Sequence, residues 1–187
     1  MEATMQHPMV RTLSIMMLNA MPKDDFTAAM SPIFDEIDDP WIAERSWNAA
    51  PFRDIESLHR AMIAAIDRAC TQDQVELLAR QPCIKERKGG LYYRRFSPEQ
   101  QAALEAKCAE YEENFGYPFL CFCKVSSPKE ILSLLDRRLQ NPPQLERITA
   151  LAELSKIARD RLDALVEQPK PIAANTSNPD GPSAAAR

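Results

Sequence analysis

Glycine and positive charge are both scarce in this chain. Only four of its 187 residues are glycine, which disfavours a phosphate-cradling loop, and neither the G-x-G-x-x-G nor the P-loop pattern occurs. The formal net charge is −4, and the isoelectric point is about 5.3. Because nonspecific binding to nucleic acid or to an anionic membrane needs a basic surface, neither kind of partner is expected.

The sequence also has no metal-binding pattern among its five cysteines, which are Cys70, Cys83, Cys108, Cys121 and Cys123. Their number is odd and their spacing matches no zinc motif, so no metal site is expected. We interpret them as reduced, small apolar residues, which is typical of a cytoplasmic protein.

Long apolar runs and alternating strand patterns are absent as well. No stretch is long enough to span a membrane, and the N-terminus lacks the pattern of a secretory signal. Without runs rich in Val, Ile and Thr, a sheet is not expected. The sequence predicts one all-α domain of about eight helices over residues 12–168, preceded by a flexible arm (1–11) and followed by a disordered tail (169–187) rich in Pro, Ala and Ser.

Helix boundaries are marked by capping residues and prolines. Ser97 and Ser127 are each followed by Pro and, three positions on, by Gln or Glu, which is the pattern of a capped N-terminus. Asp39-Pro40, Asp54 and Thr71 indicate three further starts. The predicted helices cover residues 12–19, 24–33, 41–49, 55–70, 71–80, 98–115, 128–140 and 144–167. The last of them is expected to bury Leu145, Ile148, Leu151, Leu154, Ile157, Leu162 and Leu165.

One apolar segment between two predicted helices, Tyr117–Cys123, does not fit the helical pattern. Gly116 can end the preceding helix with a positive φ, and Pro118 favours an extended Tyr117. We predict a buried extended segment whose backbone groups need hydrogen-bond partners. A bound ligand is one such partner, which makes the segment a candidate site wall; neighbouring side chains and water are the alternative.

Two other features invite a functional interpretation. Residues 85–95 are basic and contain Gly89-Gly90, so they form either a solvated loop or an anion-attracting flap over a site. His59 borders the apolar face of the helix predicted over 55–70. For this histidine a structural or surface role is favoured over a catalytic one.

Several motifs together resemble the OHCU decarboxylase family, whose members are 2-oxo-4-hydroxy-4-carboxy-5-ureidoimidazoline decarboxylases. The resemblance extends from about Leu18 to Leu165. The matching stretches are Leu18-Asn19, Asp39-Pro40-Trp41-Ile42-Ala43-Glu44-Arg45-Ser46-Trp47, Pro51-Phe52, Phe115-Gly116-Tyr117-Pro118-Phe119, Arg137-Arg138-Leu139-Gln140-Asn141 and Glu153–Leu162. It implies an all-α, dimeric enzyme without a cofactor that converts a urate-derived ureidoimidazoline to (S)-allantoin.

The resemblance also implies where the site lies. Where the family has His-Pro-Asp-Leu with an acid/base histidine, this chain has Gln81-Pro82-Cys83-Ile84. The family's second catalytic carboxylate lies in a longer segment, replaced here by the 85–95 loop, whose one carboxylate is Glu86. Tyr92 and Tyr93 are further candidates for moving a proton. Lys124 lies about where the family has a substrate-binding Arg. The candidate catalytic residues are therefore Gln81, Glu86 and Lys124, and the candidate substrate-binding residues are Pro82, Phe119, Leu120, Cys121 and Phe122.

Two functions from different classes stay open. The first is a cofactor-independent carboxy-lyase that acts on a urate-derived cyclic ureide, N-methylated forms included, or on another cyclic ureide with an altered acid/base set. Gln81 can form hydrogen bonds but cannot exchange a proton near neutral pH. The second is a catalytically inactive binding or structural protein, since a fold by itself does not establish a function. The expected form is a cytoplasmic homodimer with a small-molecule partner.

Overall fold

The computed structural model describes residues 13–35, 39–86, 90–122 and 127–167. The arm predicted over 1–11 and the tail predicted over 169–187 lie outside the described residues. So do Cys123 and Lys124.

The described chain is predominantly helical, which confirms the predicted all-α class. The α-helices are α1 (Ile15–Ala20), α2 (Lys23–Met30), α3 (Trp41–Trp47), α4 (Ile55–Asp67), α5 (Thr71–Ala79), α6 (Pro98–Phe115), α7 (Pro128–Arg138) and α8 (Pro143–Leu165). The 3₁₀ turns η1 (Ser31–Phe34) and η3 (Tyr93–Arg95) also belong to the helical part. Strand β1 (Leu13–Ser14) pairs in parallel with β2 (Val166–Glu167), a short pair where the sequence indicated no sheet.

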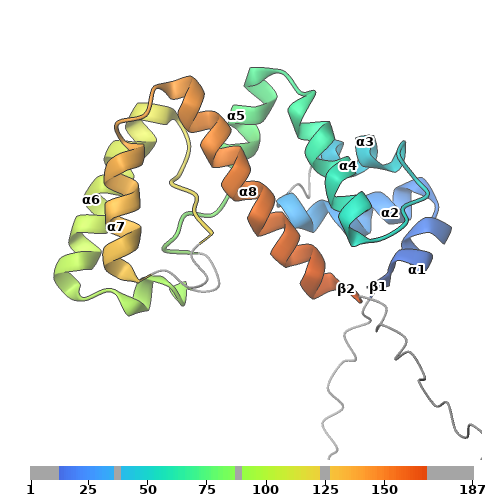
Figure 1. Cartoon of the computed structure of the whole chain (residues 1–187), viewed down its shortest axis with the longest axis horizontal. Coiled ribbons are helices and arrows are strands. Elements are labelled where there is room, and N and C mark those ends of the chain that lie inside the picture. The colour runs from blue at the N-terminus through green and yellow to red at the C-terminus, as the bar shows by residue number, and fades with distance from the viewer. Residues whose placement is uncertain (1–12, 36–38, 87–89, 123–126, 168–187) are drawn as a thin grey trace, which may run out of the picture.

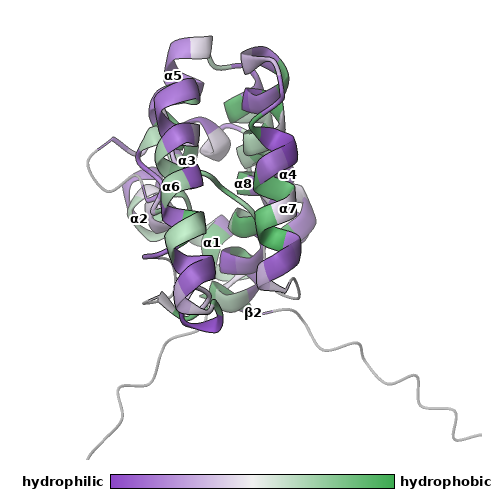
Figure 2. Cartoon of the chain, turned by 90° about the vertical axis from the view of Figure 1, so that its left-hand side faces the viewer, coloured by the Kyte–Doolittle hydropathy of each residue, from purple (hydrophilic) through white to green (hydrophobic). Residues whose placement is uncertain are grey.

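Helix α8 is the element around which the others are arranged. Figure 1 shows it running diagonally between α6 and α7 on one side and α1–α4 on the other, and it contacts α4, α5, α6 and η1. Apolar residues lie on particular faces of these helices, as Figure 2 shows, and those faces form a continuous core. Among the described residues, no helix is both long and apolar enough to cross a membrane.

The capping residues read from the sequence are largely confirmed. Ser97 and Ser127 each form a capping box, and Gly116 ends α6 with φ +78° in the left-handed region. Two starts were predicted one residue off. Pro40 is the N-cap residue of α3 rather than its first helical residue, and the Cys70 sulfur, not the Thr71 hydroxyl, accepts the capping hydrogen bond of α5.

The predicted buried face of α8 is wrong at its N-terminal end. Leu145 and Ile148 are 50% and 60% exposed, whereas Glu146 is fully buried. The buried stripe instead begins at Glu146 and continues through Ala150 and Leu154 at a spacing of four. The pattern of apolar residues misled the prediction because a charged side chain occupies an interior position, where buried partners satisfy it.

Candidate functional site

The segment from Tyr117 to Phe122 runs extended from the end of α6 and supplies one wall of the candidate site. Residues 117–121 are buried, as the sequence predicted. Two of its backbone groups bind neighbouring side chains. The Leu120 carbonyl oxygen accepts a hydrogen bond from Arg138 Nη1 at 2.5 Å, and the Phe122 N–H donates to Glu153 Oε2 at 2.6 Å. Side chains of α7 and α8 are therefore the hydrogen-bond partners of two backbone groups for which a bound ligand had been one expected partner.

A buried polar network behind this segment holds it in place. Arg138 Nε donates to Glu146 Oε1 at 2.6 Å, and Arg138 Nη2 donates to the Tyr111 hydroxyl at 3.1 Å. Tyr111 in turn donates to the Glu146 carboxylate, and Asn141 Nδ2 donates to its other oxygen at 2.6 Å. Because each charge has several partners, the cost of burying the ion pair is offset.

Burial and hydrogen bonding in this network shift the pKa values of Arg138 and Tyr111. Burial alone would lower the pKa of Arg138, but hydrogen bonding and the charge of Glu146 raise it above its ordinary value. Burial raises the pKa of Tyr111 well above its usual range, although Arg138 opposes the shift. The guanidinium carbon of Arg138 lies 4.9 Å from the centroid of the Phe119 ring, so it also contacts the wall residue directly. The network therefore keeps its charges and fixes the wall.

A pocket of about 370 Å³ lies between this wall, the turn after α5 and one face of α6. We call it the acidic pocket. Its lining residues are Ala79, Gln81, Cys83, Lys85, Glu86, Glu105, Cys108, Ala109, Glu112, Pro118 and Phe119. The volume lies within the range of small-molecule sites. Three carboxylates against one ammonium give the described lining an excess of negative charge.

The α6 residues of the acidic pocket share one helical face. Glu105, Cys108 and Glu112 recur at spacings of three and four, which places their side chains side by side. Burial, with smaller contributions from Cys83 and the two glutamates, raises the pKa of the Cys108 thiol from 9.0 to about 12. Cys108 is consequently a neutral thiol near pH 7 and a poor nucleophile.

The sequence-predicted catalytic residues fall in different surroundings. Gln81 lines the pocket but is 4% exposed, and its Nε2 donates to the carbonyl oxygens of Phe34 at 2.7 Å and Leu77 at 3.3 Å. Glu86 is exposed and lines the pocket, and its Oε2 accepts a hydrogen bond from the Cys83 N–H at 3.3 Å. Lys124 lies outside the described residues.

The predicted substrate-binding residues are only partly brought to this pocket. Phe119 lines it. Pro82 is half-buried beside it, while Leu120 and Cys121 are buried. Phe122 lies in the lining of a separate pocket that also contains His59.

The remaining candidates have partners of their own. His59 Nε2 lies 3.0 Å from the Ser155 carbonyl oxygen, a contact that agrees with a structural role. The Tyr93 hydroxyl donates to Glu105 Oε1, so the 3₁₀ turn of the 85–95 loop is tied to α6. Tyr92 is buried in the core and is not among the lining residues of the acidic pocket.

Sequence reasoning missed Glu105, Cys108 and Glu112 as lining residues. The signal was their common face on the helix that leads directly into the extended segment. Within the described part of the chain, no cluster of three or more His, Cys, Asp or Glu side chains is arranged to hold a metal ion.

Comparisons with known proteins concern the family and the fold of the chain. Residues 19–163 match the family model described as OHCU decarboxylase. A 2-oxo-4-hydroxy-4-carboxy-5-ureidoimidazoline decarboxylase of Halalkalicoccus jeotgali is 30% identical over 163 residues, which cover 82% of this chain and 92% of that protein.

Two solved structures have the same fold. The crystal structure of an (S)-allantoin synthase superposes with a TM-score of 0.70 at 21% identity, over 83% of this chain and 54% of that one. That of an OHCU decarboxylase in the presence of (S)-allantoin gives 0.59 at 21% identity, over 76% and 96%. This chain thus spans about half of the first structure and nearly all of the second.

Proposed function

Because the chain belongs to the OHCU decarboxylase family, we propose that it is a carboxy-lyase that acts on a cyclic ureide in the acidic pocket. The substrate is a urate-derived ureide, with N-methylated forms included, or a related cyclic ureide. The proposal extends to a cytoplasmic homodimer that works without a cofactor. The observation that carries it is the pocket itself, which brings Gln81, Glu86 and Phe119 together.

The reaction places three demands on such a pocket. The scissile carboxylate must leave as CO₂, its bonding electrons must be taken up by the neighbouring unsaturated ring atoms, and one proton must reach the resulting carbanion from one side. A wall made of buried aromatic and aliphatic residues, Phe119 and Leu120 among them, keeps water from the reacting carbon. The carboxylates of the pocket are the groups suited to moving the proton.

Glu86 is the proposed proton-transfer group. It is attached to a short turn through the Cys83 N–H, so its second oxygen can face the pocket. Lys85, and Lys124 by family resemblance, are the cations proposed to bind an anionic substrate. Lys lacks the bidentate geometry of Arg, which fits a substrate whose carboxylate differs in position from that of the family substrate.

The wall backbone is proposed to bind the ureide ring. In an extended segment, successive residues direct their backbone groups to opposite sides. Leu120 C=O and Phe122 N–H are already bonded to side chains of α7 and α8, so we assign the ring to the backbone groups of Phe119, a residue that lines the pocket. The amide groups of a ureide match such donors and acceptors.

The test is a substrate assay with matched glutamate variants. The freshly generated urate-derived ureidoimidazoline and its N-methylated analogues are supplied to the purified protein, and CO₂ release and the optical activity of the product are followed. We expect catalysis above the spontaneous rate for at least one of them. Glu86→Gln should lower kcat by about 10²–10⁴, whereas Glu110→Gln, an exposed residue of α6 outside the pocket, should leave it unchanged. Equal rates for the two variants would remove Glu86 from this role.

One observation favours the alternative of a binding protein without catalysis. The Gln81 amide is buried and donates to two backbone carbonyls, so it acts as a structural support for the turn after α5. Under this alternative, the cyclic ureides would bind with a measurable heat in a titration calorimeter, yet no CO₂ would be released above the spontaneous rate.

A further inference from the structure

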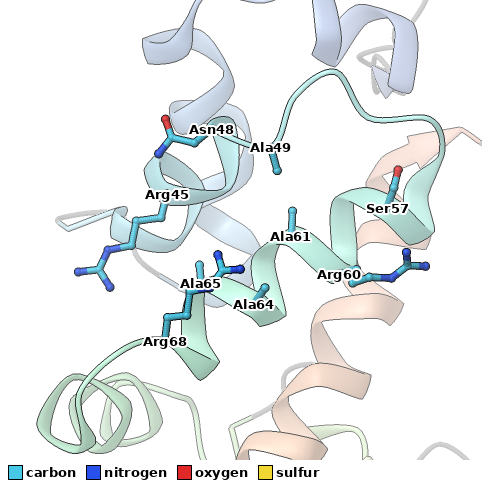
Figure 3. Close-up of a pocket in the computed structure, with 9 residues that line it drawn as sticks. All are labelled: Arg45, Asn48, Ala49, Ser57, Arg60, Ala61, Ala64, Ala65 and Arg68. Atoms are coloured by element: carbon cyan, nitrogen blue, oxygen red, sulfur yellow. The ribbon is translucent and has the colours of Figure 1, made fainter.

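A second pocket, lined by arginines, lies between α3, the turn that follows it and α4. Its volume is about 500 Å³, and we call it the arginine groove. The lining residues are Arg45, Asn48, Ala49, Ser57, Arg60, Ala61, Ala64, Ala65 and Arg68 (Figure 3). It shares no lining residue with the acidic pocket.

The shape of the groove follows from small side chains at helical spacing. Ala61, Ala64 and Ala65 lie on one face of α4 between Arg60 and Arg68, and Figure 3 shows Ala49 opposite Ala61. Alanine extends only one carbon from the backbone, so two helices that pack closely still leave a cavity above this floor. From Ser57 to Arg68 the face is about 16 Å long, enough for a ligand of several linked groups.

The charge of the groove is the reverse of that of the whole chain. Three arginines line it, in a protein of net charge −4, and Figure 3 shows the side chains of Arg45 and Arg60 extending to opposite sides. Arg60 has a carboxylate within salt-bridge distance, Glu56 at 3.7 Å. Within the described parts of the chain, Arg68 and Arg45 have no such partner at 4 Å or less.

The arginines at the two ends of the groove differ in the contacts that they already make. Arg45 stacks on the Trp41 ring, with its guanidinium carbon 4.6 Å from the ring centroid. It also borders a smaller neighbouring pocket lined by Asp39, Asp73 and Glu76. Arg68 does not line that neighbouring pocket. The Arg68 end therefore carries the charge that is most available to a ligand.

We propose that the arginine groove binds a small organic polyanion that carries phosphate or carboxylate groups. Guanidinium is the side chain best suited to these groups because it presents paired N–H donors in a plane and stays charged at every physiological pH. The Asn48 amide supplies neutral hydrogen bonds, and the alanine floor accepts an apolar middle part. This is a ligand site in addition to the one proposed for the reaction.

The experiment is calorimetric titration of the full chain with pyrophosphate and, separately, with citrate, at low and at high salt. We expect saturable binding of at least one anion that weakens at high salt. Binding of pyrophosphate alone would assign the site to phosphate compounds, and binding of citrate alone would assign it to carboxylates. Failure of both anions to bind would overturn the proposal, whatever the outcome of the decarboxylase assay.

Two groove variants and one control locate the binding. The double variant Arg60→Gln/Arg68→Gln should weaken binding by about tenfold or more, since it removes two charged hydrogen-bond donors. Ala64→Leu keeps every charge and suits a helix, but fills the floor and should weaken binding similarly. The control Lys129→Gln/Arg137→Gln removes two exposed charges from α7 and should change binding less than about twofold. If the control weakens binding as much as the groove variants, the attraction is diffuse and the proposal fails.

Discussion

The acidic pocket and the arginine groove are built alike but have opposite charges. Each uses one helical face, α6 in the first and α4 in the second, with lining residues at spacings of three and four. The first presents three glutamates and two thiols, the second three arginines over alanine. The net charge of the chain is the sum over both surfaces. A negative sum therefore does not rule out a local site for an anion.

The two pockets also differ in what supports them. One wall of the acidic pocket is an irregular extended segment, which depends on the buried Arg138 and Glu146 for its position. The groove is formed directly by two helices, α3 and α4, which contact each other closely. Substitutions in the buried network should therefore change both the geometry of the acidic pocket and the stability of the fold. Substitutions of the groove side chains should have little effect on the fold or its stability.

The largest effect expected from this difference concerns stability. Arg138→Ala leaves Glu146 buried without its cation and removes the donor to the Leu120 carbonyl, so we expect a loss of about 3–5 kcal/mol in the free energy of unfolding. Arg60→Ala in the groove removes a mostly exposed pair with Glu56 and should cost less than about 1 kcal/mol.

Urea unfolding followed by circular dichroism measures both values. Similar losses for the two variants would contradict the view that only the acidic pocket depends on buried charge. The Arg138 variant should also expose the wall, which hydrogen exchange of residues 117–122 would detect as faster exchange.

How far the sequence predicts these features depends on whether the information is local. The caps at Ser97 and Ser127 and the helix end at Gly116 depend on residues within a few positions of one another, and all three are found as predicted. The extended wall was predictable for the same reason. Pro118 and a short apolar run define it without knowledge of the fold.

Features that join distant residues were not predictable in this way. Leu145 and Ile148 were expected to be buried, because the partners that hold Glu146 in the interior, Tyr111 and Arg138, lie 35 and 8 residues away in sequence. The arginine groove escaped notice because Arg45 belongs to a different helix from Arg60 and Arg68. The sequence drew attention instead to the contiguous basic residues 85–95.

The second prediction compares the electric fields of the two pockets with thiols as probes. The Cys108 thiol, whose pKa is raised to about 12 from 9.0, should react with iodoacetamide at pH 8 about a thousandfold more slowly than an unperturbed thiol, because the thiolate is the nucleophile. A cysteine introduced by Ala64→Cys lies beside the groove arginines, which favour the thiolate. It should react faster than the exposed Cys70.

Mass spectrometry of the labelled peptides resolves each cysteine separately. The rate at Cys108 should rise about tenfold per pH unit up to about pH 12, while the rate at the introduced cysteine should level off earlier. If Cys108 reacted as quickly as the introduced cysteine at pH 8, the contrast between the two pockets would be refuted.

The smallest effect is a change in the pH dependence of stability. Burial, assisted by Glu146, raises the pKa of Tyr117 from 10.0 to about 12. Between these values the unfolded chain has released the proton and the folded chain has not, so the contribution of Tyr117 to stability is complete below about pH 10 and is lost as the pH rises toward 12.

In the described structure the Tyr117 hydroxyl also has no hydrogen-bond partner. Tyr117→Phe should therefore be neutral or stabilising by up to about 1 kcal/mol at pH 7, and its stability should fall less steeply above pH 10, by at most about one proton in the slope. Arg60→Ala, which changes a side chain of the arginine groove and not of the wall, serves as the control and should leave the alkaline slope unchanged. Urea midpoints measured from pH 7 to pH 11 give both slopes, and an unaltered slope in the Tyr117 variant would mean that the wall beside the acidic pocket is open to solvent rather than closed by the buried network.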